Sequence, residues 1–373
     1  MIGHSDPSFH AADATLGWVQ RPLLKARFRR EGDAHIEFNS AGFRDRERAL
    51  EKPHDTFRIA VLGDSYTVAF QVPVENTFCS VMEDELQKCA NLKPQRVEVL
   101  NFGVSGYNTV QELILFRQCV KSYRPDMVLV AFFAGNDVYT NSLRFGGDPM
   151  RPYATIRGGT LVLDNSFTNS GQYRFSTSRC GLVISSLLNH SSVLQVAKAG
   201  VCAINRRMQL SKHRRIANEG LPEGSEPLLY NEVYSEPSAE EWREAWDITE
   251  RLLVEMRDEI ARCGAQCVVV TITTGIQVHP DPSVRKNFEH YYGISDLFYP
   301  DARIRALGER EHFPVLNLAQ PLQHHAEKTG VYFHGLPGFK SGEGHWNAVG
   351  HALAGKIIAE SICELLGRRP AAE

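Results

Sequence analysis

The chain has 373 residues, of which 43% are hydrophobic and 23% charged, so it is globular and long enough for one large α/β domain or two smaller ones. Its formal net charge of −3 argues against nucleic acid as the main partner, because phosphate binding requires a clustered basic surface. The sequence contains no run of about 20 apolar residues, so we expect no transmembrane segment.

The first 50 residues show no strong hydrophobic period. The segment Phe38–Arg44 predicts an extended stretch with a turn, so residues 1–50 are interpreted as an extension that packs on the core. The N-terminus also lacks the charged-then-apolar pattern of a signal peptide, which favours a cytoplasmic location for the chain as written. An extracytoplasmic location is expected if an N-terminal leader or anchor has been removed.

Five short apolar runs predict the strands of the core. None alternates cleanly with polar residues, which is typical of strands buried on both faces. Helical patterns lie between them, and this alternation predicts a mainly parallel, doubly wound sheet. The runs are residues 57–63, 97–102, 127–133, 266–273 and 313–318.

The clearest helix is predicted over Ala239–Arg262, where apolar residues recur at steps of three and four and Ser238 with Glu241 forms a capping box. A last helix is expected to start near Asn347. Residues 51–140 and 238–373 are interpreted as the catalytic domain.

Residues 141–237 are interpreted as an insertion or subdomain over the functional edge of the sheet. Within it we expect a hairpin over Tyr153–Leu163, a helical stretch over Leu182–Met208 and a loop rich in Gly, Pro and Glu over Gly220–Pro227. A peripheral decoration without a role at the site is the alternative.

Eight cysteines are scattered singly, with no Cys-x-x-Cys pair. We therefore expect no disulfide framework, as in proteins of a reducing compartment. They are Cys79, Cys89, Cys119, Cys180, Cys202, Cys263, Cys267 and Cys363.

The tripeptide Gly63-Asp64-Ser65 ends the first apolar run and places a hydroxyl where strand turns into helix. In open α/β sheets, ligands bind just beyond the carboxyl ends of the strands. A serine hydroxyl needs a base within hydrogen-bond reach to act as a nucleophile, and donors for the oxyanion that forms when it attacks a carbonyl. Ser65 is therefore a candidate nucleophile.

Three later segments supply such groups. The second run leads into a turn at 103–109 whose glycines leave backbone N–H groups exposed, and the third ends in Gly135-Asn136-Asp137 with an amide side chain at the same edge. Near the C-terminus, His345 stands on the loop before the final helix.

In this order the four blocks resemble the SGNH (GDSL-type) hydrolase superfamily, with a His-Trp-Asn variant of the last block. The resemblance implies a flavodoxin-like three-layer α/β sandwich on a five-stranded, mainly parallel sheet, with no cofactor and no metal. It also implies Ser65 as the nucleophile and His345 as the general base. The oxyanion hole would consist of the Ser65 and Gly106 N–H groups and the Asn136 amide.

The last block departs from the usual family pattern. The family places Asp three residues before the histidine, where this chain has Gly342. Glu343, two residues before, is the nearest carboxylate and is predicted to orient His345 and stabilise its protonated form. A Ser–His dyad oriented by a backbone carbonyl is the alternative.

These residues predict a serine esterase or acylhydrolase that acts on a small-molecule or carbohydrate ester. An acyltransferase that passes the acyl group to a carbohydrate or other alcohol is one alternative, and a catalytically inactive binding scaffold is another. The sequence has no Gly-x-Ser-x-Gly elbow, Walker loop, dinucleotide fingerprint or His-Glu-x-x-His motif, which argues against those classes of site.

Overall fold

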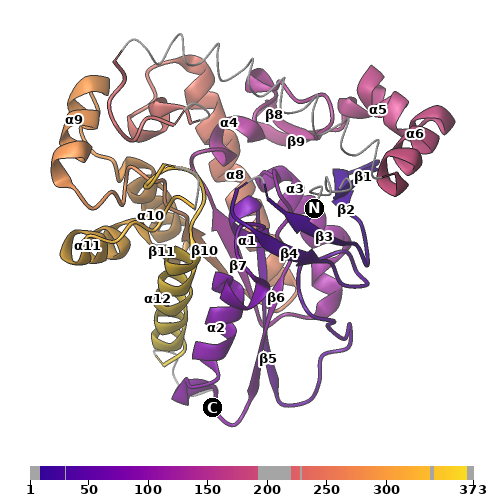
Figure 1. Ribbon diagram of the computed structural model, residues 1–373, viewed down its shortest axis with the longest axis horizontal. Coiled ribbons are helices and arrows are strands. Elements are labelled where there is room, and N and C mark those ends of the chain that lie inside the picture. Colours follow the sequence, from indigo (N-terminus) through magenta and orange to yellow (C-terminus); the bar gives the residue numbers. More distant parts are fainter. Residues whose placement is uncertain (1–8, 30, 192–219, 227–228, 337–339, 368–373) are drawn as a thin grey trace.

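The computed structural model describes residues 9–29, 31–191, 220–226, 229–336 and 340–367 (Figure 1). At its centre is a five-stranded sheet in which every neighbouring pair is parallel, in the order β11-β10-β7-β5-β6. The predicted α/β fold and all five predicted strands are confirmed. The strands are β5 (Thr56–Gly63), β6 (Arg96–Asn101), β7 (Met127–Phe132), β10 (Gln266–Thr271) and β11 (Val315–Asn317).

The order of the strands decides where a site can form. The chain moves outward from β5 to β6 and then returns to the other side of β5 as β7. This reversal is the topological switch point of a flavodoxin-like sheet, where loops diverge and leave a crevice at the carboxyl ends of the strands.

Helices cover both faces of the sheet because its side chains alternate between two hydrophobic cores. Ala60 and Leu62 of β5 pack with helices α3, α8 and α10, whereas Ile59 and Val61 pack with α2, α11 and α12. The helices are α2 (Phe78–Leu86), α3 (Thr109–Gln118), α8 (Glu240–Arg262), α10 (Tyr299–Glu311), α11 (Ala319–Thr329) and α12 (Ala348–Gly367).

Helix α8 begins at Glu240, within one residue of the prediction, but the predicted capping box is wrong. The N-cap is Ala239, which has no side-chain acceptor, and no side-chain hydrogen bond caps the helix. Ser238 lies one residue before the cap. Its carbonyl oxygen, rather than its hydroxyl, accepts a hydrogen bond from Arg243.

The N-terminal region forms two antiparallel hairpins, β1 (His10–Asp13) with β2 (Gly17–Gln20) and β3 (Lys25–Phe28) with β4 (Ala34–Glu37). The second hairpin buries Ala34 and Ile36 of β4, followed by Phe38, against Val68 and Phe70. Val68 is the last residue of the helix that begins at Ser65, and Phe70 follows that helix. The hairpin therefore lies next to the nucleophile candidate.

The segment between β7 and α8 begins with α4 (Asp137–Asn141) and contains the predicted hairpin, formed by β8 (Tyr153–Arg157) and β9 (Thr160–Asp164). In Figure 1, α4, β8 and β9 lie beyond the carboxyl ends of the central strands. Helices α5 (Gly171–Thr177) and α6 (Arg179–His190) follow. Residues 192–208 of the predicted helical stretch lie outside the described residues, and the division of the chain into domains stays a prediction.

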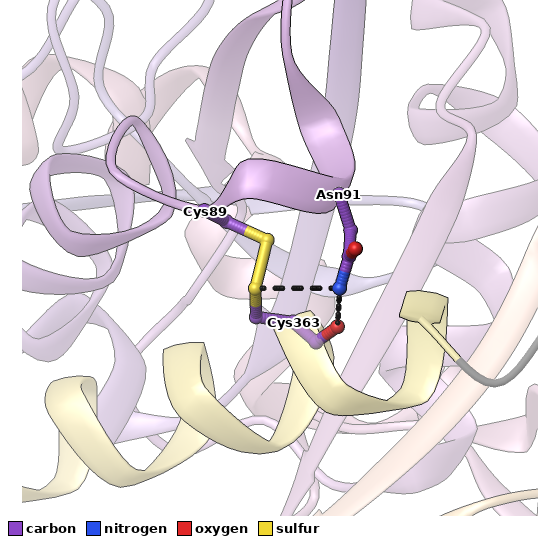
Figure 2. Close-up of a disulfide and its surroundings, with 3 residues drawn as sticks. All are labelled: Cys89, Asn91 and Cys363. Carbon is purple, nitrogen blue, oxygen red and sulfur yellow. Dashed lines mark hydrogen bonds between the residues drawn. A yellow bond between two sulfur atoms is a disulfide. The ribbon is translucent and has the colours of Figure 1, made fainter.

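A disulfide joins Cys89, just after α2, to Cys363 of α12 (Figure 2). The two residues are 274 positions apart in the chain, with their Cα atoms 5.9 Å apart, and Asn91 Nδ2 donates a hydrogen bond to the Cys363 carbonyl oxygen at 2.9 Å. The expectation of no disulfide is therefore wrong for this pair. Single, widely spaced cysteines gave no sign that packing of α2 against α12 would bring these two together.

Five other described cysteines are free thiols: Cys79, Cys119, Cys180, Cys263 and Cys267. Among the described residues, no helix has both the length and the apolar character needed to cross a bilayer.

Candidate active site

Ser65 is the first residue of α1 (Ser65–Val68), and only Asp64 separates it from the end of β5. The turn is too tight for a side chain at position 63, because a Cβ added to Gly63 would lie 2.1 Å from Thr67 Oγ1. Asp64 caps the helix by accepting the Tyr66 N–H at 2.9 Å. Local sequence thus turns the chain sharply and leaves Ser65 half-buried at the carboxyl edge of the sheet.

His345 lies between Ser65 and a carboxylate of the N-terminal region. Its Nε2 is 2.8 Å from Ser65 Oγ, and its Nδ1 is 2.6 Å from Glu31 Oε2. The other oxygen of Glu31 accepts the His345 backbone N–H at 2.9 Å. Because an ionised carboxylate can only accept hydrogen bonds, Nδ1 carries the proton and Nε2 offers its lone pair to the hydroxyl.

Glu343, the predicted partner of His345, points elsewhere. Its carboxylate pairs with Lys340 Nζ at 2.8 Å, and among the described residues it makes no hydrogen bond to His345. Gly344 between them has a positive φ of +78°, so the chain turns there and sends the two side chains apart. The prediction of Glu343 as orienting acid is therefore wrong in its geometry, and Glu31 takes that place.

Sequence reasoning missed Glu31 because it lies in the polar turn between β3 and β4, where charged residues are ordinary. No motif marks it. Only the packing of the hairpin beside α1 brings it to His345, which is 314 positions away in the chain.

Each partner shifts the pKa of the other. Burial works to raise the pKa of Glu31, but hydrogen bonds and charge attraction from His345 outweigh it and lower the value to about 2. Burial likewise works to lower the pKa of His345, and the hydrogen bond and charge of Glu31 outweigh it, so the pKa is raised. The pair therefore stabilises a protonated imidazole beside an ionised carboxylate.

Gly106 lies on the turn after β6 with a φ of +80°, a backbone conformation that favours glycine. The Val104 N–H donates to the Gly63 carbonyl oxygen at 3.0 Å, which ties this turn to the nucleophile turn. Within the described part of the chain, neither the Ser65 nor the Gly106 N–H donates an intramolecular hydrogen bond. Both donors are thus unengaged beside the switch point.

Asn136 follows β7, the strand on the other side of β5, and is the N-cap residue of α4. Its Nδ2 donates to Asp64 Oδ2 at 2.6 Å, next to the nucleophile. An amide nitrogen has two N–H groups, so the second is left to donate elsewhere. Asp137 holds the loop by accepting the Phe133 N–H at 2.8 Å.

The loop that carries His345 is anchored through the Gly344 carbonyl oxygen. That oxygen lies 2.7 Å from His334 Nδ1 and accepts the Tyr66 hydroxyl at 3.2 Å. Burial lowers the pKa of His334 to about 4, so its ring is neutral at pH 7. On its other side, His334 Nε2 lies 3.0 Å from Thr273 Oγ1, which accepts the Trp346 indole N–H at 2.9 Å. Trp346 is fully buried.

The described residues contain no group of three or more His, Cys, Asp or Glu side chains arranged to bind a metal ion.

No protein-family model matches the chain. Among solved structures, the acetyl xylan esterase AlAXEase is similar over 82% of this chain and 100% of its own (TM-score 0.39, 11% identity). A catalytic mutant of Axe2, an acetylxylan esterase from Geobacillus stearothermophilus, is similar over 84% of this chain and 95% of its own (TM-score 0.39, 12% identity). TesA is similar over 83% of this chain and 99% of its own (TM-score 0.37, 12% identity).

An arylesterase of Vibrio mimicus is 32% identical over 79 residues, which are 21% of this chain. The matched region spans 38% of the arylesterase's length. The structure places the four sequence blocks at the ends of β5, β6 and β7 and just before α12. In these blocks the chain resembles the SGNH (GDSL-type) hydrolase superfamily. Compared with the usual SGNH pattern, this chain takes the carboxylate beside its histidine from a distant hairpin.

Proposed function

We propose that the protein is a serine esterase that cleaves a carboxylic ester through an acyl-enzyme intermediate. The observation that carries this proposal is the hydrogen-bonded chain Ser65–His345–Glu31 at the switch point of the sheet. It provides a nucleophile, a base and a group that orients the base, which is the arrangement that acyl transfer requires.

In the first half of the reaction, Ser65 Oγ attacks the ester carbonyl carbon while His345 Nε2 takes its proton. Glu31 stabilises the resulting imidazolium. Negative charge develops on the carbonyl oxygen, where the Ser65 and Gly106 N–H groups and the second Asn136 N–H are the proposed donors. The tetrahedral intermediate then breaks its bond to the alkoxy oxygen, and His345 returns the proton to the leaving alcohol.

In the second half, His345 takes a proton from water as the water oxygen attacks the acyl carbon on Ser65. The ester bond to Ser65 breaks, the acid leaves, and Ser65 regains its proton from His345. A small-molecule or carbohydrate ester is the proposed substrate class. Transfer to a carbohydrate or other alcohol would use the same acyl-Ser65 and differ only in the group that attacks it.

Hydrolysis of p-nitrophenyl esters with acyl chains of two to twelve carbons tests the proposal. We expect Ser65→Ala to lose on the order of 10⁵- to 10⁶-fold in kcat, as when other serine hydrolases lose their nucleophile. Ser166→Ala, at an exposed position in the long segment between β7 and α8, is the matched control and should keep wild-type turnover. Wild-type turnover by Ser65→Ala would overturn the nucleophile assignment.

Two further measurements separate the alternatives. Product analysis with a sugar acceptor present distinguishes hydrolysis, which yields only free acid, from acyl transfer, which yields an esterified sugar. A fluorophosphonate probe should label Ser65, as seen by mass spectrometry of the peptide that contains it. An inactive scaffold would give neither turnover nor labelling.

We also propose that the protein works in an oxidising compartment, because disulfides form and persist there and are rare in the cytosol. The Cys89–Cys363 bond supports this location over the cytoplasmic one expected from the sequence. Alkylation of free thiols in freshly lysed cells, followed by mass spectrometry, should leave Cys89 and Cys363 unmodified. Alkylation of both would point to a reducing compartment.

A further inference from the structure

The loop at residues 220–226 belongs to the long segment between β7 and α8, and it docks on the edge of the sheet that carries the active site. Gly224 (φ +86°) fits against Ile276, where an added Cβ would lie 2.5 Å from Ile276 Cδ1. Ser225 Oγ lies 3.0 Å from the hydroxyl of Tyr292, at the end of α9 (Pro282–Tyr292). These contacts fix the backbone just before Glu226.

Glu226 reaches from this loop to the residue before His345. Its Oε2 accepts the Gly344 N–H at 3.0 Å. The carboxylate also lies against Gly275 on the loop after β10, where an added Cβ would be 3.2 Å from Glu226 Oε1. Glu226 therefore links the insertion, the end of β10 and the histidine loop through a single side chain.

Two carboxylates thus hold two successive peptide groups. Glu31 accepts the His345 N–H and Glu226 accepts the Gly344 N–H, while His334 and Tyr66 hold the Gly344 carbonyl oxygen. Both carboxylates also lie close enough to His345 for their charges to raise the pKa of its imidazole. The backbone at 344–345 is consequently fixed at both N–H groups and at the carbonyl between them.

We propose that Glu226 is a second positioning carboxylate of the active site, which holds the Gly344 peptide so that His345 faces Ser65 and places negative charge beside the imidazole. This inference rests on the proposed function and deepens it. It gives the long segment between β7 and α8 a role in the chemistry, beyond covering the edge of the sheet.

The environment of Glu226 makes its charge sensitive to pH near neutrality. Burial raises the pKa of Glu226 to about 7; the Gly344 N–H and His345 oppose the rise, and Glu343 adds to it. The hydroxyls of Tyr66 and Tyr234 also face Glu226, and after burial its charge contributes to raising their pKa values. Above this pH the ionised carboxylate makes a charge-assisted hydrogen bond to Gly344, which is stronger than a neutral one.

Three variants test the proposal. Glu226→Ala removes both the acceptor and the charge, so we expect kcat to fall roughly 10- to 100-fold, the scale of one hydrogen bond to a charged group, with KM unchanged within about threefold. Glu226→Gln keeps an acceptor for Gly344 and should recover most of kcat. Glu223→Gln, an exposed residue of the same loop, is the matched control and should behave as wild type.

The pH profile gives a readout that a merely structural role would not move. Glu226→Gln removes a charge that favours the imidazolium, so the acidic limb of kcat/KM should move to lower pH. Wild-type kcat and an unmoved acidic limb in both Glu226 variants would overturn the proposal.

An NMR titration of the His345 imidazole, assigned by the loss of its signal in His345→Asn, separates this proposal from the proposed function. The pKa of His345 should be lower in Glu226→Gln than in wild type. This measurement needs no substrate, so it decides the role of Glu226 even if no ester is hydrolysed. Identical titration in the two proteins would overturn the role of Glu226 while leaving the esterase proposal intact.

Discussion

The two halves of the active site are built in different ways. Ser65 and Asn136 each lie within four residues of the end of a buried strand, and their positions result from short sequence blocks and from the order of adjacent strands. The loop of His345 is held instead by residues remote in the chain, Glu31 at 314 positions and Glu226 at 118 positions from the groups they bind. The nucleophile half is thus local in origin, whereas the position of the base depends on how distant segments pack.

This difference explains why short sequence motifs mark one half of the site and not the other. A sharp strand-to-helix turn needs only a few residues of the right type. A carboxylate that orients an imidazole has only to lie within hydrogen-bond distance of it, so any segment of the chain that packs there can supply it. In this protein the supplying segment is the β3–β4 turn rather than the residues next to His345.

The most decisive test of this comparison neutralises each of the two candidate acids in a separate variant. We expect Glu31→Gln to lower kcat by about 10³- to 10⁴-fold, the scale seen when a triad acid is neutralised. Glu343→Gln should stay within about threefold of wild type, because exposed ion pairs contribute little. Steady-state kinetics with one p-nitrophenyl ester would measure both. The reverse ranking would restore Glu343 as the orienting acid.

The oxyanion donor at the end of β7 should have the next largest effect. Asn136→Ala removes an amide N–H and is expected to lower kcat by about 10²- to 10³-fold. Because Asn136 also bonds Asp64, circular dichroism should first establish that the variant folds. A folded variant with less than about a threefold loss would mean that the amide does not face the oxyanion.

The disulfide should affect stability rather than chemistry. A double Cys89→Ala, Cys363→Ala variant is expected to lose about 2 to 4 kcal/mol in the free energy of unfolding, because the crosslink restricts the unfolded chain. Its kcat should remain near wild type, since no contact of the bond reaches the described residues of the site. Urea denaturation measures the loss. An unchanged unfolding free energy would indicate that α12 is held by its packing alone.

The smallest expected effect is the pH dependence of the Glu31–His345 pair. The pKa of Glu31 is lowered from 4.5, so its contribution to stability is present above pH 4.5 and lost as pH falls toward 2. The pKa of His345 is raised from 6.5, so its contribution is present below pH 6.5 and lost as pH rises through the folded value.

The difference in unfolding free energy between wild type and Glu31→Gln should therefore be largest between pH 4.5 and 6.5. Urea denaturation of the two proteins at pH 3, 5.5 and 9 would measure it. A difference that is the same at all three values would show that the pair contributes no charge-dependent stability.

Periodicity and composition by themselves determined the core of this protein. The five strands, helices α8 and α12 and the hairpin at β8–β9 follow from local patterns, since buried strands and amphipathic helices are defined by neighbouring residues. The placement of Ser65 and Asn136 at one edge also follows, because parallel strands bring their carboxyl ends together.

Only the tertiary structure decided which groups meet at His345 and which cysteines pair. Glu31 lies in an ordinary polar turn, Glu226 in an ordinary loop, and Cys89 and Cys363 stand alone in the sequence. Their roles arise from contacts between segments far apart in the chain, and such contacts leave no period or spacing in a single sequence. A hydrogen bond depends on distance and direction in space, and these are settled when the hairpin, the loop and α12 pack on the sheet.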